Sequence, residues 1–118
     1  MRISGAPLCL VLLGLGVPAA HAHGSLDHAS PSVGSTVNAD PHGVMLTFTG
    51  ELEPAFSKVT VTDAGGAEVS QGKAQISGRT IRVGLKALSG GTYKVNWRAV
   101  TIDSHTTEGS FTFRVDDQ

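Results

Sequence analysis

The histidines near the N-terminus are the first residues along the chain that could bind a metal ion. The stretch "AHAHGSLDH" places His21, His23 and His28 within eight positions. Imidazole nitrogen is a common ligand for copper, nickel and zinc. What these histidines can bind depends on where the processed chain begins, because a free terminal amine gives a first-position histidine a second nitrogen donor.

The first 22 residues predict a secretory signal peptide. Arg2 supplies a positive start, residues 8–17 are a continuous apolar run, and residues 18–22 are small residues before a cut. The alternative is an amphipathic or buried N-terminal helix. The apolar run is too short to span a bilayer and no second one follows, so we expect a periplasmic protein without a membrane anchor, with residues 23–118 as one domain.

The cleavage rule A-x-A selects Ala20-His21-Ala22, which makes His23 the first residue of the processed chain. Its amine and imidazole could then close a chelate ring on one metal ion. A cut after Ala20 would instead leave His21-Ala22-His23 at the terminus. A free terminus with a histidine at the third position is itself a plausible chelator of Cu(II) or Ni(II). Cys9 leaves with the leader, so disulfides and thiolate metal sites are excluded.

A second pair of candidate ligands stands in "VTIDSHTTEG", where Asp103 and His105 are two positions apart. On an extended chain both side chains leave the same face and can converge on one ion. The alternative is a polar turn in which Asp103 and Ser104 bond nearby backbone amides. Spacing alone does not bring His23 near this pair.

The elements that must position these residues are strands. Five segments alternate apolar and polar residues, and the glycine-rich stretches 63–66 and 88–91 are typical of turns that join antiparallel strands. The pattern predicts an all-β fold, a seven-stranded Greek-key sandwich or barrel of the Ig-like or cupredoxin-like kind. A net charge of -1 gives no reason to expect nucleic-acid binding. The alternating segments are 44–50, 57–63, 79–85, 92–100 and 108–115.

The chain resembles the CopC family of periplasmic copper-resistance proteins. The likeness covers the segments "HGSLDHASPSVG", "LTFTGELEPAFSKVTVTDAGG" and "GTYKVNWRAVTIDSHTTEGSFTFRV". It implies that the N-terminal strand lies near the Asp-x-His loop, and that His23, Asp103 and His105 hold one Cu(II) per chain. Three nitrogens and one oxygen suit tetragonal Cu(II), and the lack of sulfur ligands disfavours Cu(I).

Two departures from the family concern further ligands. Some members carry an acidic residue two positions after the phenylalanine that matches Phe48, whereas here Gly50 stands there and Glu51 comes one place late. A one-residue offset on a strand turns a side chain to the other face, so Glu51 is left out of the ligand set. Other members have a methionine-rich loop for Cu(I), but residues 63–78 contain neither methionine nor histidine. We expect no second copper site.

The remaining histidines and Met45 have ordinary interpretations. His28 is expected on a solvent-facing strand position, with a place beside the metal as the alternative. His42 follows Asp40-Pro41 in a turn. Met45 is expected to pack within or beside a sheet, because one thioether without partners makes a poor copper site.

The aromatic residues Tyr93 and Trp97 are expected in the core, and shielding of the copper is a further role considered for Trp97. Arg98 could pair with Asp103 or with Glu108.

The resemblance implies a non-enzymatic, monomeric carrier or sequestering protein in copper homeostasis and resistance, which could pass copper to an inner-membrane transport protein. One alternative is a copper-dependent oxidase or monooxygenase, because an N-terminal histidine with a second histidine also holds copper in enzymes that activate oxygen. Short loops and an occupied axial position at Asp103 argue against it. The other alternative is a metal-free Ig-like interaction module, which would not depend on where the leader is cut.

Overall fold

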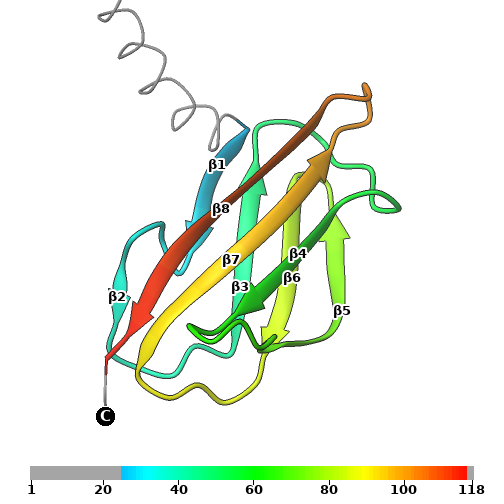
Figure 1. The fold of residues 1–118 in the computed structure, drawn as a ribbon. Coiled ribbons are helices and arrows are strands. Elements are labelled where there is room, and N and C mark those ends of the chain that lie inside the picture. Colours follow the sequence, from blue (N-terminus) through cyan, green and yellow to red (C-terminus); the bar gives the residue numbers. More distant parts are fainter. Residues whose placement is uncertain (1–24, 117–118) are drawn as a thin grey trace, which may run out of the picture.

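The computed structural model describes residues 25–116, in which eight strands form two four-stranded sheets (Figure 1). The predicted leader and His23 lie outside the described residues. The strands are β1 (Leu26–Ser30), β2 (Thr36–Val37), β3 (Gly43–Phe48), β4 (Lys58–Thr62), β5 (Ser70–Ser77), β6 (Thr80–Leu85), β7 (Gly91–Val100) and β8 (Thr106–Val115).

One sheet has the order β1-β3-β6-β5 and the other β2-β8-β7-β4, so the predicted all-β sandwich is confirmed. Neighbouring strands run antiparallel, except that β2 runs parallel to β8. The strand count is eight rather than the predicted seven, because the two-residue β2 adds one. The strand β5 lies in a segment where no strand was predicted, because its residues do not alternate regularly. The irregularity has a structural cause: Gly72 has φ +77°, and the register with β6 shifts between Gln71 and Gln75.

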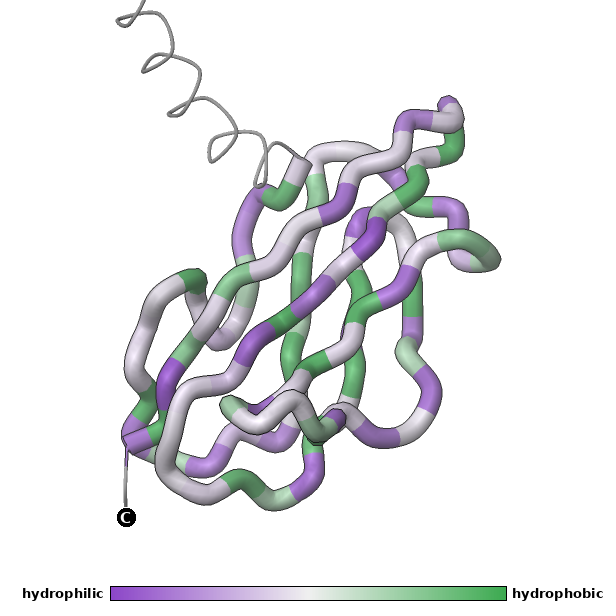
Figure 2. The backbone as a smooth tube through the Cα atoms, viewed as in Figure 1, coloured by the Kyte–Doolittle hydropathy of each residue, from purple (hydrophilic) through white to green (hydrophobic). Residues whose placement is uncertain are grey.

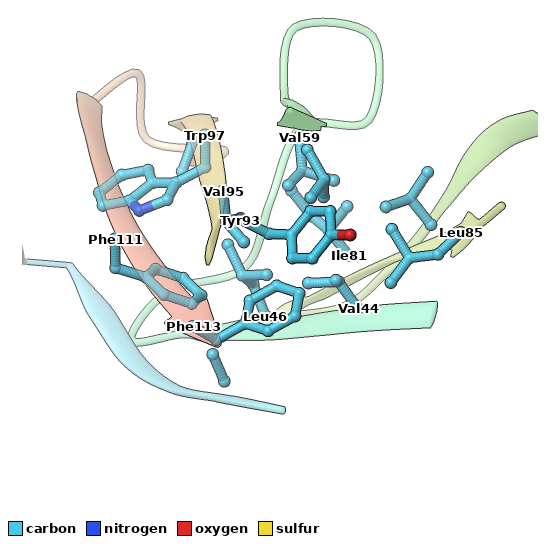
Figure 3. Packing of buried hydrophobic residues seen from close by; sticks show 14 of the residues in the cluster. Val44, Leu46, Val59, Ile81, Leu85, Tyr93, Val95, Trp97, Phe111 and Phe113 are labelled. Atoms are coloured by element: carbon cyan, nitrogen blue, oxygen red, sulfur yellow. The ribbon is translucent and has the colours of Figure 1, made fainter. Parts of the chain in front are cut away.

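The core lies between the sheets and is built from the inward residues of the alternating strands (Figure 3). On β7 the residues Tyr93, Val95, Trp97 and Ala99 are all buried, as their alternation predicts. The Trp97 indole packs edge-on against Phe48, with ring centroids 5.2 Å apart. This packing makes β7 a rigid support for the turn that follows it.

The two glycine-rich turns differ in what they join. Residues 63–66 do form a turn, in which Asp63 Oδ1 accepts hydrogen bonds from the backbone N–H groups of Gly65 and Ala67, both at 2.9 Å. The chain nevertheless passes from β4 in one sheet to β5 in the other, and residues 88–91 likewise link β6 to β7 across the sandwich. Residues 63–66 still close a short antiparallel pairing, in which Thr62 lies opposite Glu68 and the Val69 N–H donates to the Val61 carbonyl, so the predicted turn is confirmed there. Residues 88–91 join strands of different sheets, because glycine fixes a bend but not the sheet in which the next strand pairs.

The longest pairing of the fold is the β7–β8 hairpin, whose register runs from Gly91 opposite Val115 to Val100 opposite Thr106. Its connecting turn contains Asp103 and His105 and projects beyond the sandwich (Figure 1). No helix within residues 25–116 is long and apolar enough to cross a membrane.

Candidate metal site

The turn that carries Asp103 and His105 is closed by hydrogen bonds to Thr101. The Thr101 N–H donates to the His105 carbonyl at 2.9 Å, and the Ser104 N–H donates to the Thr101 carbonyl at 2.8 Å. Ser104 has φ +73°, in the left-handed region. The segment is therefore a tight turn, which is the alternative that the sequence left open, rather than an extended chain.

The tight turn still brings the two predicted ligands together. The Asp103 Oδ1 and His105 Nδ1 atoms are 3.0 Å apart, and the side chains are 68% and 79% exposed, respectively. The other imidazole nitrogen, Nε2, makes no hydrogen bond within residues 25–116. An exposed carboxylate beside an exposed imidazole leaves both groups accessible to an ion from solvent.

Thr101 lowers the pKa of the Asp103 carboxyl and was missed by the sequence analysis. Its Oγ1 donates a hydrogen bond to Asp103 Oδ1. This bond, followed by the one from His105, lowers the pKa of Asp103 from 3.8 to about 2. Asp103 is thus an anionic oxygen donor at any pH near neutrality. The available signal was a hydroxyl residue two positions before the aspartate.

A hollow beside the turn brings three parts of the chain together. Asp103 and His105 line it from the turn, Ser25 lines it from just before β1, and Glu51 lines it from the loop after β3. Ser25 Oγ is hydrogen-bonded to Thr107 Oγ1 at the start of β8. The first described residue of the chain is therefore held against the hairpin that carries the candidate ligands.

Glu51 lies closer to this hollow than the sequence argument allowed. The face rule applies only within a strand, and β3 ends at Phe48, before Glu51 is reached. The Glu51 carbonyl accepts a hydrogen bond from the Ile102 N–H at 3.0 Å, which fixes the loop beside the turn. Yet no three His, Cys, Asp or Glu side chains form a metal-binding group anywhere in residues 25–116. Asp103 and His105 are a pair that needs donors from elsewhere, and the predicted third ligand, His23, lies outside the described residues.

The two other histidines within residues 25–116, His28 and His42, and Met45 do not line the hollow. His28 is exposed on β1, with its Nδ1 3.2 Å from Asp27 Oδ2. His42 is exposed in the loop before β3. Met45 is half-buried, and its sulfur accepts a hydrogen bond from Arg82 Nε at 3.4 Å. The positions of His28 and Met45 confirm the ordinary interpretations given to them, whereas His42 lies in an irregular loop rather than in a turn.

Arg98 pairs with Glu108 at 2.7 Å, which settles the choice that the sequence left open. Tyr93 and Trp97 are core residues, with exposures of 5% and 3%. Trp97 is not among the residues that line the hollow.

The region that matches a known family has nearly the same bounds as the described fold. Residues 26–116 match the CopC domain family. The chain is 35% identical to copper resistance protein C of Xanthomonas campestris pv. juglandis over 97% of this chain and 96% of that protein. It is 38% identical to copper resistance protein C of Pseudomonas syringae pv. tomato, over 81% and 82% of the two chains. Among solved structures, CopC from Methylosinus trichosporium OB3b superposes with a TM-score of 0.70 and 35% identity, covering 80% of this chain and 94% of that one.

Proposed function

The chain belongs to the CopC family, and from this membership and the geometry of the β7–β8 turn we propose that it is a non-enzymatic periplasmic Cu(II) carrier or sequestering protein. The observation that carries the proposal is the pairing of an ionised Asp103 with an exposed His105 beside the first described residue of the chain. The copper ion is the cargo.

The proposed ligand set is the amine and imidazole of His23, a carboxylate oxygen of Asp103 and the imidazole of His105. Ser25 lines the same hollow as the Asp103–His105 pair, and two residues of chain span at most about 7 Å. A histidine two residues before Ser25 is thus tethered within reach of the hollow. Three nitrogens and one oxygen suit Cu(II), and copper heads the divalent affinity order.

The 3.0 Å contact between Asp103 and His105 allows two roles for the carboxylate. Asp103 can bind copper directly, or it can accept the His105 Nδ1–H and so present Nε2 to the ion. We propose direct binding, since the carboxylate is exposed and ionised. Asp103→Asn separates the two roles: loss of an outer-shell partner costs about 10–100-fold in affinity, and loss of a ligand costs more.

The proposal is tested on the chain secreted with its own leader and recovered from the periplasm of the expression host. Intact mass before and after Cu(II) addition reports both the N-terminus and the stoichiometry. We expect a chain that begins at His23 and gains one copper. His105→Ala should lose tight binding, and the exposed His28→Ala serves as a matched control that should keep it. Binding of two copper ions, or equal affinity in both variants, would contradict the ligand set.

A further inference from the structure

Four of the eight basic side chains within residues 25–116 lie on the outer face of the sheet that contains β4, β7 and β8. The strands alternate, so that the core residues point inward and Lys58, Lys94, Arg98 and Arg114 point outward, all four exposed. We call these four residues the basic face. Among the strand residues of this sheet, Glu108 is the only carboxylate, and it is paired with Arg98. Exposed Asp116, directly after β8, is a second carboxylate near this face, and the four cations still leave an excess of positive charge on it in a chain whose formal charge is -1.

Two like charges of the basic face lie opposite each other, which destabilises the fold. Lys58 on β4 lies directly opposite Arg98 on β7 in the strand register. Like charges in such positions repel each other. Glu108 compensates only Arg98, while the side chains of Lys58 and Lys94 have no ion pair or hydrogen bond with any residue in 25–116. An anionic partner laid over the sheet would remove this repulsion.

The rest of the surface indicates the kind of partner. Its other outward residues are polar, apart from half-buried Val100 at the end of β7, and hydrophilic residues recur along β4, β7 and β8 in Figure 2. Protein interfaces are usually anchored by aromatic or apolar side chains at their centre, and this face offers none. A layer of anionic lipid headgroups requires only a flat cationic surface.

We propose that the basic face docks on an anionic lipid bilayer. The four cations would lie over acidic headgroups, and no side chain needs to enter the hydrocarbon. The strands β7 and β8 carry both this face and the turn with Asp103 and His105. Docking through the sheet would therefore hold the candidate copper site along the bilayer surface, with its exposed turn free for exchange.

The test measures sedimentation of the periplasmically processed chain with phosphatidylcholine vesicles that contain or lack phosphatidylglycerol. We expect binding only to the anionic vesicles. The variant Lys58→Gln/Lys94→Gln/Arg114→Gln should weaken the partition coefficient by roughly 100-fold, since each cation at an anionic surface is worth roughly fivefold. Arg98 is kept in this variant because it compensates Glu108.

The matched control is Lys73→Gln/Arg79→Gln/Lys86→Gln, which removes the same charge from exposed positions away from the basic face. It should weaken binding by less than roughly fivefold. Unchanged circular dichroism and Cu(II) binding in both variants would show that neither effect comes from misfolding.

The unaltered chain provides a second measurement that requires no variant. Binding to anionic vesicles should fall steeply as salt is raised above about 0.15 M, where the screening length is about 8 Å. Absence of binding at low salt, binding that resists salt, or an equal loss in both triple variants would overturn the proposal. Capture by soluble polyglutamate without binding to anionic vesicles would also overturn it, in favour of an acidic protein surface.

Discussion

The substitution Thr101→Val tests whether the Thr101 hydroxyl lowers the pKa of Asp103. Valine keeps the branched shape and removes the hydroxyl that donates to Asp103 Oδ1. That bond is the largest cause of the lowered pKa of Asp103, and the bond from His105 is the next. Because His105 remains, the pKa of Asp103 should rise from about 2 but stay below its ordinary value of 3.8.

The sign of the effect on stability follows from this shift. A carboxylate with a lowered pKa in the folded state stabilises that state above pH about 4, and this contribution is lost as the pH falls through about 2. Thr101→Val should make the loss of stability over that window shallower and leave Asp103 ionised at pH 7. Cu(II) affinity at pH 7 should therefore fall only through poorer orientation, by roughly tenfold, the lower end of outer-shell effects.

The pKa is measured by NMR titration of the Asp103 carboxyl carbon, and Cu(II) affinity is measured by competition with a chelator. Thr112→Val is the matched control, because Thr112 is an exposed strand residue of β8 far along the hairpin from the turn. An Asp103 pKa that does not move in Thr101→Val would refute the assigned cause. A loss of copper affinity as large as that of His105→Ala would refute the view that Thr101 only orients Asp103 and does not itself bind copper.

Three further predictions concern pH, stability and redox chemistry. Cu(II) affinity should fall as the pH is lowered, because copper competes with protons for the free amine and imidazole nitrogens, while Asp103 stays ionised; a competition titration that is flat between about pH 7 and 5 would exclude these nitrogens. Phe48→Ala should lower the free energy of unfolding by about 3–5 kcal/mol in a urea titration, because Phe48 is 1% exposed and packs on Trp97; a loss below about 1 kcal/mol would contradict this packing. The copper-loaded chain should produce little peroxide with ascorbate and oxygen if Asp103 occupies the ion; turnover well above that of a carrier control would favour the oxidase interpretation.

The sandwich could be predicted because its central strands alternate without interruption. In β7 every second residue from Tyr93 to Ala99 is buried, so periodicity alone assigns the two faces. The strand β5 could not be assigned in this way, because the positive φ of Gly72 and the register shift beside it break the alternation. The sheet to which a strand belongs was also beyond periodicity, since the turns at 63–66 and 88–91 cross between the sheets.

The candidate site was predicted by residue type better than by geometry. The structure brings Asp103 and His105 into contact, but the contact depends on a tight turn with a left-handed Ser104 and on Thr101 hydrogen bonds that spacing does not encode. Glu51 was set aside by a rule for strands, whereas the strand ends before it. Tertiary contacts of loops determine these details.

The central claim is that the chain holds one Cu(II) through a free N-terminal His23 together with Asp103 and His105. The most direct test compares, by chelator competition, the processed chain with a form that carries one extra alanine before His23. The extension turns the amine into an amide, a far poorer donor at neutral pH, and leaves residues 25–116 unchanged. We predict one tight Cu(II) in the processed chain and a loss of orders of magnitude in the extended one, comparable to that of His105→Ala. Equal Cu(II) affinity of the two forms would contradict the claim.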